Sequence, residues 1–494
     1  MSEAEREGKM NDIHVAEKPV QAGLEFPGGM LIDGQIVAGA TAFDVIDPAT
    51  GEVFAQAPDA DRDDLDRAVT AARCAFPHWA ARDFAARRGV IAQIASRLRT
   101  SAEPLGALLT AEQGKPLRDA IGEVRRAADH IEALSAFDVA GGVLREDARE
   151  RVEIRYRPLG VVGGITPWNV PVMLAMVKIA QALYTGNCIV LKPSPLTPLS
   201  TLAIGEAIAD IVPPGTVNIL SGGNDLGVWL TNHPGVDKIS FTGSVATGRH
   251  VMASAAATFK RVTLELGGND PAIVLPDADL DATADAIARS AFANCGQVCM
   301  AIKRVFVHRT LYPAMVEALA SRAAAIRVGP GSHPRSEMGP IQNRMQFEKV
   351  AALLEGVRAT PGARIVTGGT VYAGPGYFVE PTVVTGLDDE APLVREEQFG
   401  PVLPVLVYDD IEDVVRRANA TEFGLGASVW TQDSARGANI ARRIEAGLVW
   451  VNRHGGNGRD VPFGGAKHSG YGREQGVAGM QSYMEMQAVT VPKG

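Results

Sequence analysis

The chain has 494 residues, a formal net charge of −9, 46% hydrophobic residues and 21% charged residues. A chain of this length can form two or three domains, each with a full hydrophobic core, and its composition is ordinary for a soluble globular protein. The acidic balance and the lack of a basic run argue against a nucleic-acid partner and against an anionic membrane surface.

The sequence begins MSEAEREGKMNDIHVAEKPVQ, which is charged and has no apolar core, so we expect no signal peptide there. We expect residues 1–25 to form a flexible or extended lead-in. Four cysteines without a secretory signal indicate a reducing compartment, which we expect to be the cytoplasm.

Two amphipathic surface helices are expected first, at Asp63–Phe76 and Asp83–Leu98. Arg151–Pro158 then alternates charged and apolar residues, as a half-exposed strand does. Such a strand needs protection at its edge or recruits a partner. This segment is therefore either an oligomerisation strand or a simple solvated hairpin.

The segment Leu159–Val177 carries no charge and approaches transmembrane length. Its prolines and glycines would leave backbone groups unpaired in lipid. We therefore predict a buried strand, an irregular turn and the start of a helix, and we expect no membrane partner.

From Leu159 onward, short apolar runs alternate with helical stretches. The first series predicts strands at Val161–Ile165, Cys188–Leu191, Val217–Leu220, Lys238–Phe241 and Val262–Leu266, with helices beginning near Val172, Pro198, Asp225 and Val245. The second predicts strands at Ala272–Leu275, Arg304–His308, Leu403–Tyr408, Ala427–Thr431 and Gly447–Asn452, with helices at Leu280–Phe292, Leu311–Ile326, Met345–Arg358 and Asp433–Ile444. Apolar strands spaced by helices indicate parallel sheets covered on both faces. Two such series predict two α/β domains with a boundary near Gly267.

The stretch ANCGQVCMA contains two cysteines, Cys295 and Cys299. A reducing compartment disfavours a disulfide between them, and no His or Cys pair stands nearby at zinc-ligand spacing, so we expect no metal. A lone cysteine is most often a small buried hydrophobic residue. Three cysteines receive this interpretation: Cys74, Cys188 and Cys295. Cys299 differs because the pair Gly296-Gln297 breaks the helical pattern before it, and a thiol at such a break can be exposed to a substrate.

Two polar residues stand next to predicted strands. Glu265 ends a strand in LELGGND, and open α/β sheets place their sites at the carboxyl ends of parallel strands. The alternative is an edge glutamate that faces water, but the two following glycines permit a close backbone approach and favour function. Asn169 lies in ITPWNVP, where it is either an ordinary turn residue or a donor to an oxyanion.

Two further features suit a phosphate or a ribose. The segment Phe241–Gly248 (FTGSVATG) follows a strand and opens a helix, so its backbone N–H groups can approach a phosphate. It does not have the G-x-G-x-x-G pattern. Lys192 also follows a strand, and it either donates to a ribose hydroxyl or is solvated.

Together these segments resemble the aldehyde dehydrogenase superfamily from about Ile32 to the C-terminus. Six motifs occur in the family's order: ITPWN, FTGSVATG, ELGGND, GQVC, EEQFGPV and PFGGAKHSGYGRE. The resemblance implies an α/β fold with a Rossmann-like cofactor-binding domain (26–143 and 159–267), an α/β catalytic domain (268–477) and a small β oligomerisation arm (144–158 and 478–494). It also implies a homodimer or homotetramer, paired through Arg151–Pro158 and the segment after Tyr483.

The resemblance implies the catalytic roles as well. Cys299 would be the nucleophile, with Cys295 as a neighbour one turn away on a helix face. Asn169 and a backbone N–H near Cys299 would hold the oxyanion, and Glu265 would activate the water that hydrolyses the thioester. Relatives that pass the acyl group to coenzyme A commonly lack this glutamate, so a free acid is the expected product. Lys178 matches a family lysine with a supporting role near the site.

For the cofactor, the resemblance implies that Glu397 binds the nicotinamide ribose and that Phe399 flanks the nicotinamide ring. The other expected contacts are Ile165, Trp168, Lys192, Ser194, Gly227, Phe241, Gly243, Ser244 and Leu266. Many NAD-preferring members have a glutamate at the position of Pro195, where it accepts both ribose hydroxyls and repels a 2′-phosphate. We expect NAD because no added Lys or Arg stands beside Ser194, while Pro195 leaves NADP possible.

The expected substrate is a small-molecule aldehyde. The residues expected to line its tunnel are Val170, Met173, Leu174, Val177, Met300 and Asn457. Aliphatic residues where the family often has aromatic ones predict a roomy channel for a medium-sized hydrophobic or aromatic aldehyde.

Three alternatives remain. The polar loop Arg453–Asp460 either packs at a subunit interface or, through Arg453 or Arg459, binds the carboxylate of a semialdehyde. A catalytically silent cofactor-binding structural protein is disfavoured, because it has no physical need for Cys299, Glu265 and Asn169.

Overall fold

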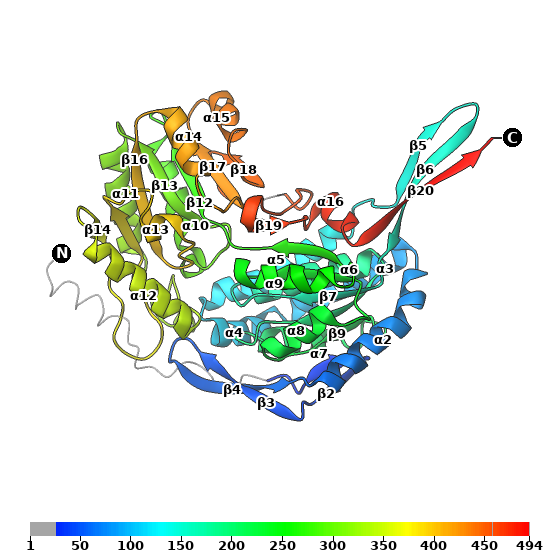
Figure 1. Cartoon of the computed structure of the whole chain (residues 1–494). Coiled ribbons are helices and arrows are strands. Elements are labelled where there is room, and N and C mark those ends of the chain that lie inside the picture. The colour runs from blue at the N-terminus through cyan, green and yellow to red at the C-terminus, as the bar shows by residue number, and fades with distance from the viewer. Residues whose placement is uncertain (1–25, 457, 494) are drawn as a thin grey trace.

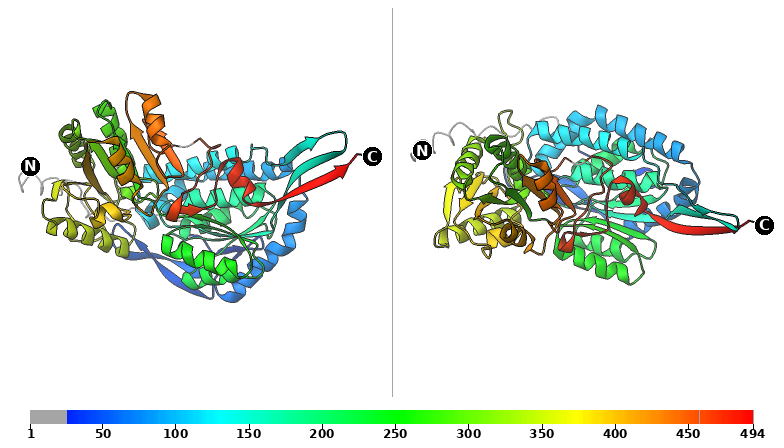
Figure 2. Two further views of the ribbon diagram at one scale, coloured as in Figure 1. Left: turned by 45° about the horizontal axis from the view of Figure 1, so that its top comes forward. Right: turned by 90° about the horizontal axis from the view of Figure 1, so that it is seen from above.

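The computed structural model describes residues 26–456 and 458–493 (Figure 1). The expected lead-in at residues 1–25 and the predicted tunnel residue Asn457 lie outside these ranges. Two layered α/β bodies lie side by side, and a β arm extends away from one of them (Figure 2).

The first sheet has the strand order β19-β11-β10-β7-β8-β9-β1-β2. Its parallel strands are β7 (Val161–Ile165), β8 (Cys188–Lys192), β9 (Val217–Ile219), β10 (Lys238–Thr242) and β11 (Arg261–Glu265). Its antiparallel strands are β1 (Met30–Ile32), β2 (Gln35–Val37) and β19 (Gly470–Tyr471). Both faces of this sheet are apolar because helices cover them.

One face of the first sheet carries α2 (Arg62–Ala80), α8 (Asn224–Asn232) and α9 (Val245–Ala256). The other face carries α6 (Pro171–Tyr184) and α7 (Leu199–Ile208), which are covered by α3 (Phe84–Thr100), α4 (Ala102–Gln113) and α5 (Leu117–Leu134). A separate hairpin, β3 (Thr41–Asp47) with β4 (Glu52–Asp59), precedes α2.

The second sheet has the order β14-β15-β16-β13-β12-β17-β18. Its strands are β12 (Asp270–Val274), β13 (Ile302–His308), β14 (Arg364–Thr367), β15 (Thr382–Thr385), β16 (Val402–Tyr408), β17 (Gly426–Trp430) and β18 (Leu448–Val451). Its helices are α10 (Leu280–Phe292), α11 (Tyr312–Ala325), α12 (Arg344–Ala359), α13 (Pro392–Arg395), α14 (Ile411–Asn419) and α15 (Ser434–Ala441). Successive residues of β12 and the residue after it alternate between two cores: Ala272 and Val274 face one, and Ile273 and Leu275 face the other.

The arm is a sheet of β5 (Gly141–Glu146), β6 (Glu150–Pro158) and β20 (Met484–Pro492). A short helix, α16 (Gly476–Gln481), leads into β20. Strand β6 confirms the predicted half-exposed strand, and it pairs with β20 from Pro158↔Met484 to Glu150↔Pro492. Across the described ranges, no helix is both long and apolar enough to cross a bilayer.

Most predicted elements of the two series are confirmed, with small shifts at their ends. The uncharged segment Leu159–Val177 is β7, an irregular turn and the start of α6, as predicted. The prediction for Cys74 was wrong, because this residue is exposed. At about 100° per residue, Cys74 lies on the opposite side of α2 from Ala72, which faces the core.

A buried glutamate joins α5 to α6 and to the turn before it. The Glu123 carboxylate accepts hydrogen bonds from the backbone N–H groups of Val172 (3.0 Å) and Met173 (3.2 Å), at the N-terminus of α6. It also forms a buried ion pair with Lys115, whose Nζ donates to the backbone oxygen of Asn169 at 3.1 Å. The turn that contains Asn169 is therefore fixed by charges inside the protein.

We predict that Glu123→Ala lowers the free energy of unfolding by about 3–5 kcal/mol, because it leaves the Lys115 ammonium buried without its partner. The matched control is Glu103→Ala, which removes the exposed ion pair with Arg125 and should cost about 1 kcal/mol or less. Urea denaturation measures both changes. Equal losses in the two variants would contradict the assignment.

Candidate active site

Asn169 is held in the turn between β7 and α6, and Pro171 is the first residue of α6. The Asn169 side chain is buried, and its Nδ2 donates to the backbone oxygen of Gln297 at 2.9 Å. In return, Asn294 Nδ2 donates to the backbone oxygen of Asn169 at 2.9 Å. Because a carboxamide carries two N–H groups and Gln297 takes one, the other is left to donate to a ligand.

The loop that follows α10 carries Cys299 and is sharply bent. Asn294 and Cys295 have φ values of 50° and 59°, and Gly296 has a φ of 71°. A Cβ at Gly296 would collide with the backbone oxygen of Gly400, so only glycine fits there. The prediction that Cys295 lies on a helix face one turn from Cys299 was wrong, because the helix ends at Phe292.

Cys299 is partly exposed, unlike the buried Cys188 and Cys295. Burial of its sulfur raises the pKa of the Cys299 thiol to about 12, and the Lys303 ammonium opposes this shift. Lys303 Nζ donates to the backbone oxygen of Val298 at 2.5 Å. The Lys303 ammonium therefore lies against the loop that carries the Cys299 thiol.

Glu265, the last residue of β11, is 2% exposed, and neither carboxylate oxygen has a hydrogen-bond partner in the described part of the chain. Burial raises the pKa of Glu265 well above its usual value; Glu474 adds to the shift, while Lys178 and Arg473 oppose it. A Cβ at Gly464 would lie 2.9 Å from Glu265 Oε1, so the loop before β19 closes over this carboxylate.

Lys178 lies in α6 and is fully buried. Its Nζ donates to Glu474 Oε1 at 2.5 Å and to Ser240 Oγ at 2.9 Å, and Ser240 Oγ donates to the same Glu474 oxygen at 2.7 Å. These three residues form a satisfied polar cluster beside Glu265. Sequence reasoning missed Ser240 and Glu474, although Glu474 ends the motif PFGGAKHSGYGRE.

The link from β11 to β12 passes close to the Glu397 carboxylate and to the backbone of Cys299. The backbone N–H of Gly268 donates to Glu397 Oε1 at 2.9 Å, and a Cβ at Gly267 would collide with the same carboxylate. A Cβ at Gly268 would lie 2.6 Å from the backbone oxygen of Cys299. The close backbone approach predicted for these glycines is therefore present.

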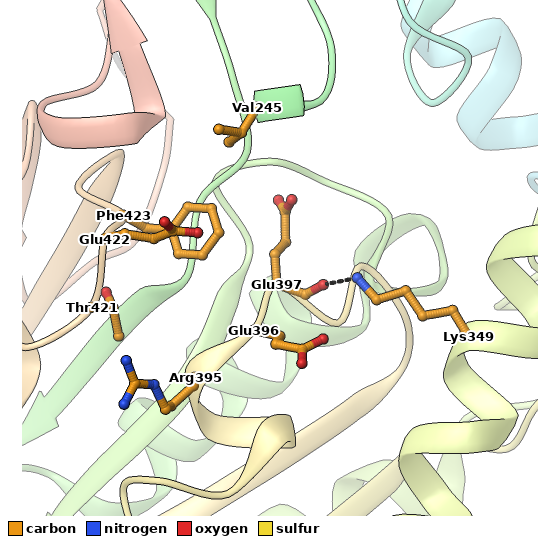
Figure 3. A pocket seen from close by; sticks show the side chains of 8 residues that line it. All are labelled: Val245, Lys349, Arg395, Glu396, Glu397, Thr421, Glu422 and Phe423. Atoms are coloured by element: carbon orange, nitrogen blue, oxygen red, sulfur yellow. Dashed lines mark hydrogen bonds between the residues drawn. The ribbon is translucent and has the colours of Figure 1, made fainter. Parts of the chain in front are cut away.

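Glu397 also borders a cleft of about 460 Å³ (Figure 3). The residues around the cleft are Val245, Lys349, Arg395, Glu396, Glu397, Thr421, Glu422 and Phe423. Burial raises the pKa of the Glu397 carboxyl, and Lys303 opposes this shift. The cleft runs from Glu397 to Val245, the first residue of α9.

Phe399 follows Glu397 and has a φ of 47°. Its ring packs edge-on against Trp168, with the ring centroids 5.3 Å apart. Sequence reasoning assigned both aromatic residues to the cofactor, and the structure brings them together at the end of β7.

Three of the remaining predicted cofactor residues, Ile165, Lys192 and Phe241, lie at the carboxyl ends of adjacent strands of the first sheet. Ile165 pairs with Lys192 on one side and with Phe241 on the other. Burial lowers the pKa of Lys192 to about 8, while Asp59 opposes the shift. A Cβ at Gly227 would lie 3.8 Å from the Lys192 side chain, so this glycine of α8 leaves space beside the lysine.

Three more predicted cofactor residues lie near these strand ends, and a fourth follows β8. The backbone N–H of Gly243 donates to the backbone oxygen of Glu265 at 3.0 Å, and Ser244 caps α9. The Leu266 side chain packs against Gly248. Ser194 Oγ accepts from the backbone N–H of Leu196 at 3.2 Å.

The predicted tunnel residues differ in exposure. Val170, Met173, Leu174 and Met300 are partly exposed. Val177 was expected at the tunnel entrance but is 1% exposed, because it faces the packed side of α6. Arg453 donates to the backbone oxygens of Gly455 and Gly456 in its own loop, which engages the guanidinium inside that loop.

The comparison with protein families agrees with this arrangement. The model of the aldehyde dehydrogenase family matches residues 36–489. The chain belongs to the aldehyde dehydrogenase family. It is an NAD(P)-dependent oxidoreductase that oxidises an aldehyde.

Known relatives match over most of the chain. It is 39% identical to a betaine aldehyde dehydrogenase of Rhizobium etli in an alignment over 477 residues that covers 94% of this chain and 97% of the relative. A solved point mutant of the aldehyde dehydrogenase of Bacillus cereus is 37% identical with a TM-score of 0.92, covering 96% of this chain and 99% of the other. The betaine aldehyde dehydrogenase of Staphylococcus aureus, solved with NAD+, is 32% identical with a TM-score of 0.90, covering 94% and 95%.

We predict that the rate of Cys299 alkylation by iodoacetamide, in the protein without cofactor, rises about tenfold per pH unit between about pH 7 and pH 10. Only the thiolate reacts, and the raised pKa keeps the thiol protonated over this range. A Cys299→Ser variant gives the background from the exposed Cys74. A rate that levels off below about pH 8 would show that the Lys303 ammonium lowers the pKa of the Cys299 thiol by more than burial raises it.

Proposed function

We propose that this dehydrogenase uses Cys299 as its nucleophile and releases a free carboxylic acid. The observation that carries the proposal is that two groups from the first α/β body meet the Cys299 loop. The Asn169 amide donates to the Gln297 backbone of that loop, and the Glu265 carboxylate, which has no hydrogen-bond partner within the described residues, lies within electrostatic reach of the thiol. This arrangement supports acyl transfer through a covalent thioester.

In the proposed mechanism, the Cys299 thiol passes its proton to the Glu265 carboxylate and on to solvent, and the thiolate adds to the aldehyde carbon. The second N–H of Asn169, together with a backbone N–H near Cys299, stabilises the oxyanion that forms. A nicotinamide cofactor, bound beside Glu397 and Phe399, supplies the acceptor for the hydride. Glu265 then takes a proton from the water that hydrolyses the thioester, and its raised pKa makes it a stronger base than an exposed glutamate. Lys178 acts through Glu474, whose charge bears on Glu265.

We propose that the substrate is a medium-sized hydrophobic or aromatic aldehyde. Val170, Met173 and Leu174 give the approach to the site an aliphatic lining, and Arg453 is engaged inside its own loop. The alternative remains a semialdehyde whose carboxylate is bound by Arg459.

The test is cofactor reduction by the purified protein with aliphatic, aromatic and carboxylate-bearing aldehydes. We predict the highest kcat/KM for hydrophobic or aromatic aldehydes and no turnover in the Cys299→Ser variant. If short semialdehydes have the highest kcat/KM, the substrate proposal is overturned, but the proposed mechanism stands. No turnover by folded, reduced wild-type protein would favour a silent cofactor-binding protein.

We propose NAD as the preferred cofactor, with NADP accepted less well. Lys192 suits a ribose hydroxyl, whereas Pro195 can neither accept a hydrogen bond from the ribose hydroxyls nor repel a phosphate. The solved Staphylococcus aureus relative carries NAD+.

We predict that Pro195→Glu lowers kcat/KM for NADP by about tenfold or more, equivalent to about 1.4 kcal/mol of repulsion, without lowering that for NAD. Pro195→Gln is the matched control, since it has the same length and no charge and should leave NADP use near the wild-type value. Equal NADP losses in both variants would show that shape rather than charge excludes the phosphate.

We propose further that the arm pairs two or more copies of the chain, as a homodimer or homotetramer in the cytoplasm. Exposed apolar residues on the arm support the pairing: Val143, Leu144, Met486 and Val491. A molar mass of one chain by light scattering would contradict it.

A further inference from the structure

A histidine from the polar loop after β18, His454, contacts the residue that follows Cys299. The His454 side chain is 1% exposed, and its Nε2 is 2.8 Å from the backbone oxygen of Met300, the residue after Cys299. The chain reaches this point through Asn452, whose φ is 57° and whose Oδ1 accepts from the backbone N–H of Thr431 at 2.9 Å.

The partners of His454 determine its tautomer. Met300 offers a carbonyl oxygen, which can only accept, so Nε2 must carry the proton. On the other side, Nδ1 is 3.0 Å from Ser428 Oγ, and that oxygen already accepts from Trp430 Nε1 at 2.9 Å. The Ser428 hydroxyl is therefore free to donate to Nδ1. Along the series Trp430, Ser428, His454 and Met300, each hydrogen bond then has one donor and one acceptor.

Asp270 reinforces this arrangement. Its Oδ1 accepts from the backbone N–H of Gly426 at 3.0 Å, while its Oδ2 lies 3.5 Å from His454 Nε2 and has no hydrogen-bond partner within the described residues. A buried carboxylate on the Nε2 side favours a proton on that nitrogen. Asp270 is also the first residue of β12, directly after the link that approaches Cys299.

Ser428, His454 and Asp270 are the residue types of a hydrolytic triad, but they are arranged differently. In such a triad the serine faces Nε2 and the carboxylate faces Nδ1. Here the order is reversed, and Ser428 is fully buried within β17. The cluster has no accessible nucleophile of its own, so its effect passes through Met300.

The loop also contacts the Met300 side chain. A Cβ at Gly455 would lie 3.4 Å from Met300 Cε, so the sulfur-bearing chain lies against the loop at this glycine. Arg453 closes the loop by donating to Gly455 and Gly456. Both the backbone and the side chain of Met300 are therefore held by the same few residues.

We propose that His454 is a positioning residue for Cys299. By donating from Nε2 to the Met300 carbonyl, it fixes the peptide between Met300 and Ala301, one residue beyond the nucleophile, and so restrains the loop that directs the thiol and the Cys299 backbone N–H. The proposal rests on the assignment of Cys299 as the nucleophile. It makes the polar loop part of the support of the reacting group.

The test compares His454→Gln with His454→Asn. The Gln amide nitrogen can reach the position of Nε2 and donate to Met300, whereas the shorter Asn amide reaches only the position of Nδ1. We expect His454→Gln to keep kcat within about threefold of wild type, and His454→Asn and His454→Ala to lose about 10- to 100-fold, as a misplaced reacting group does. KM for the cofactor should stay constant.

A second readout is the rate of Cys299 alkylation by iodoacetamide, corrected with the Cys299→Ser variant, which should fall in the same order. This readout needs no substrate, so it tests His454 even if the proposed aldehyde oxidation through Cys299 fails. Equal kinetic losses in the Gln and Asn variants would overturn the proposal. Variants that lose activity only in proportion to their loss of folded protein, measured by circular dichroism, would overturn it in favour of a purely structural role.

Discussion

The short link between β11 and β12 is the constraint on which the site depends. It leaves the first sheet at Glu265 and enters the second at Asp270, and its glycines pass between the Glu397 carboxylate and the backbone of Cys299. A side chain at Gly267 or Gly268 would widen this passage. Because Glu265 belongs to one sheet and Cys299 follows α10 of the other, any widening would separate the proposed base from the proposed nucleophile.

Unfavourable features gather at the site. Several buried charges in the described chain have a partner of opposite charge, as Lys115 has in Glu123 and Lys178 has in Glu474. Glu265 instead lies buried with both oxygens unpaired in the described chain, which costs stability. Left-handed backbone at Asn294, Cys295 and Phe399 adds strain around the same point. Packing of the two sheets has to offset these costs, because reactivity requires an unsatisfied base and an accessible thiol.

The sequence predicted the parallel strands well because their signal is local: apolar runs between helices leave few alternatives. It singled out Cys299, Glu265 and Asn169 because each stands at a break in such a pattern or at its end, and the resemblance to the family then implied their roles. It failed at Cys295, where one left-handed residue after another ends the helix, and composition does not reveal that geometry. It missed Glu474 and Ser240 because their contact with Lys178 joins positions that are far apart in the chain. The paired β6 and β20 are another long-range contact of this kind.

The loop after β18 shows how a long-range contact changes an interpretation. From sequence alone, its arginines and glycines suggest a polar surface that could bind a charged substrate. In the structure Arg453 is engaged by its own loop, and His454 turns inward to Met300. The inward half of the loop therefore contacts the residue after Cys299, and Arg453 donates to the backbone of its own loop. Val170, Met173 and Leu174, the residues proposed to line the approach, come from the same turn and helix that present Asn169. In the proposed mechanism one element therefore supplies both the oxyanion donor and the apolar lining, so an aliphatic substitution in α6 is expected to alter substrate preference while the turn that holds Asn169 keeps its buried contacts.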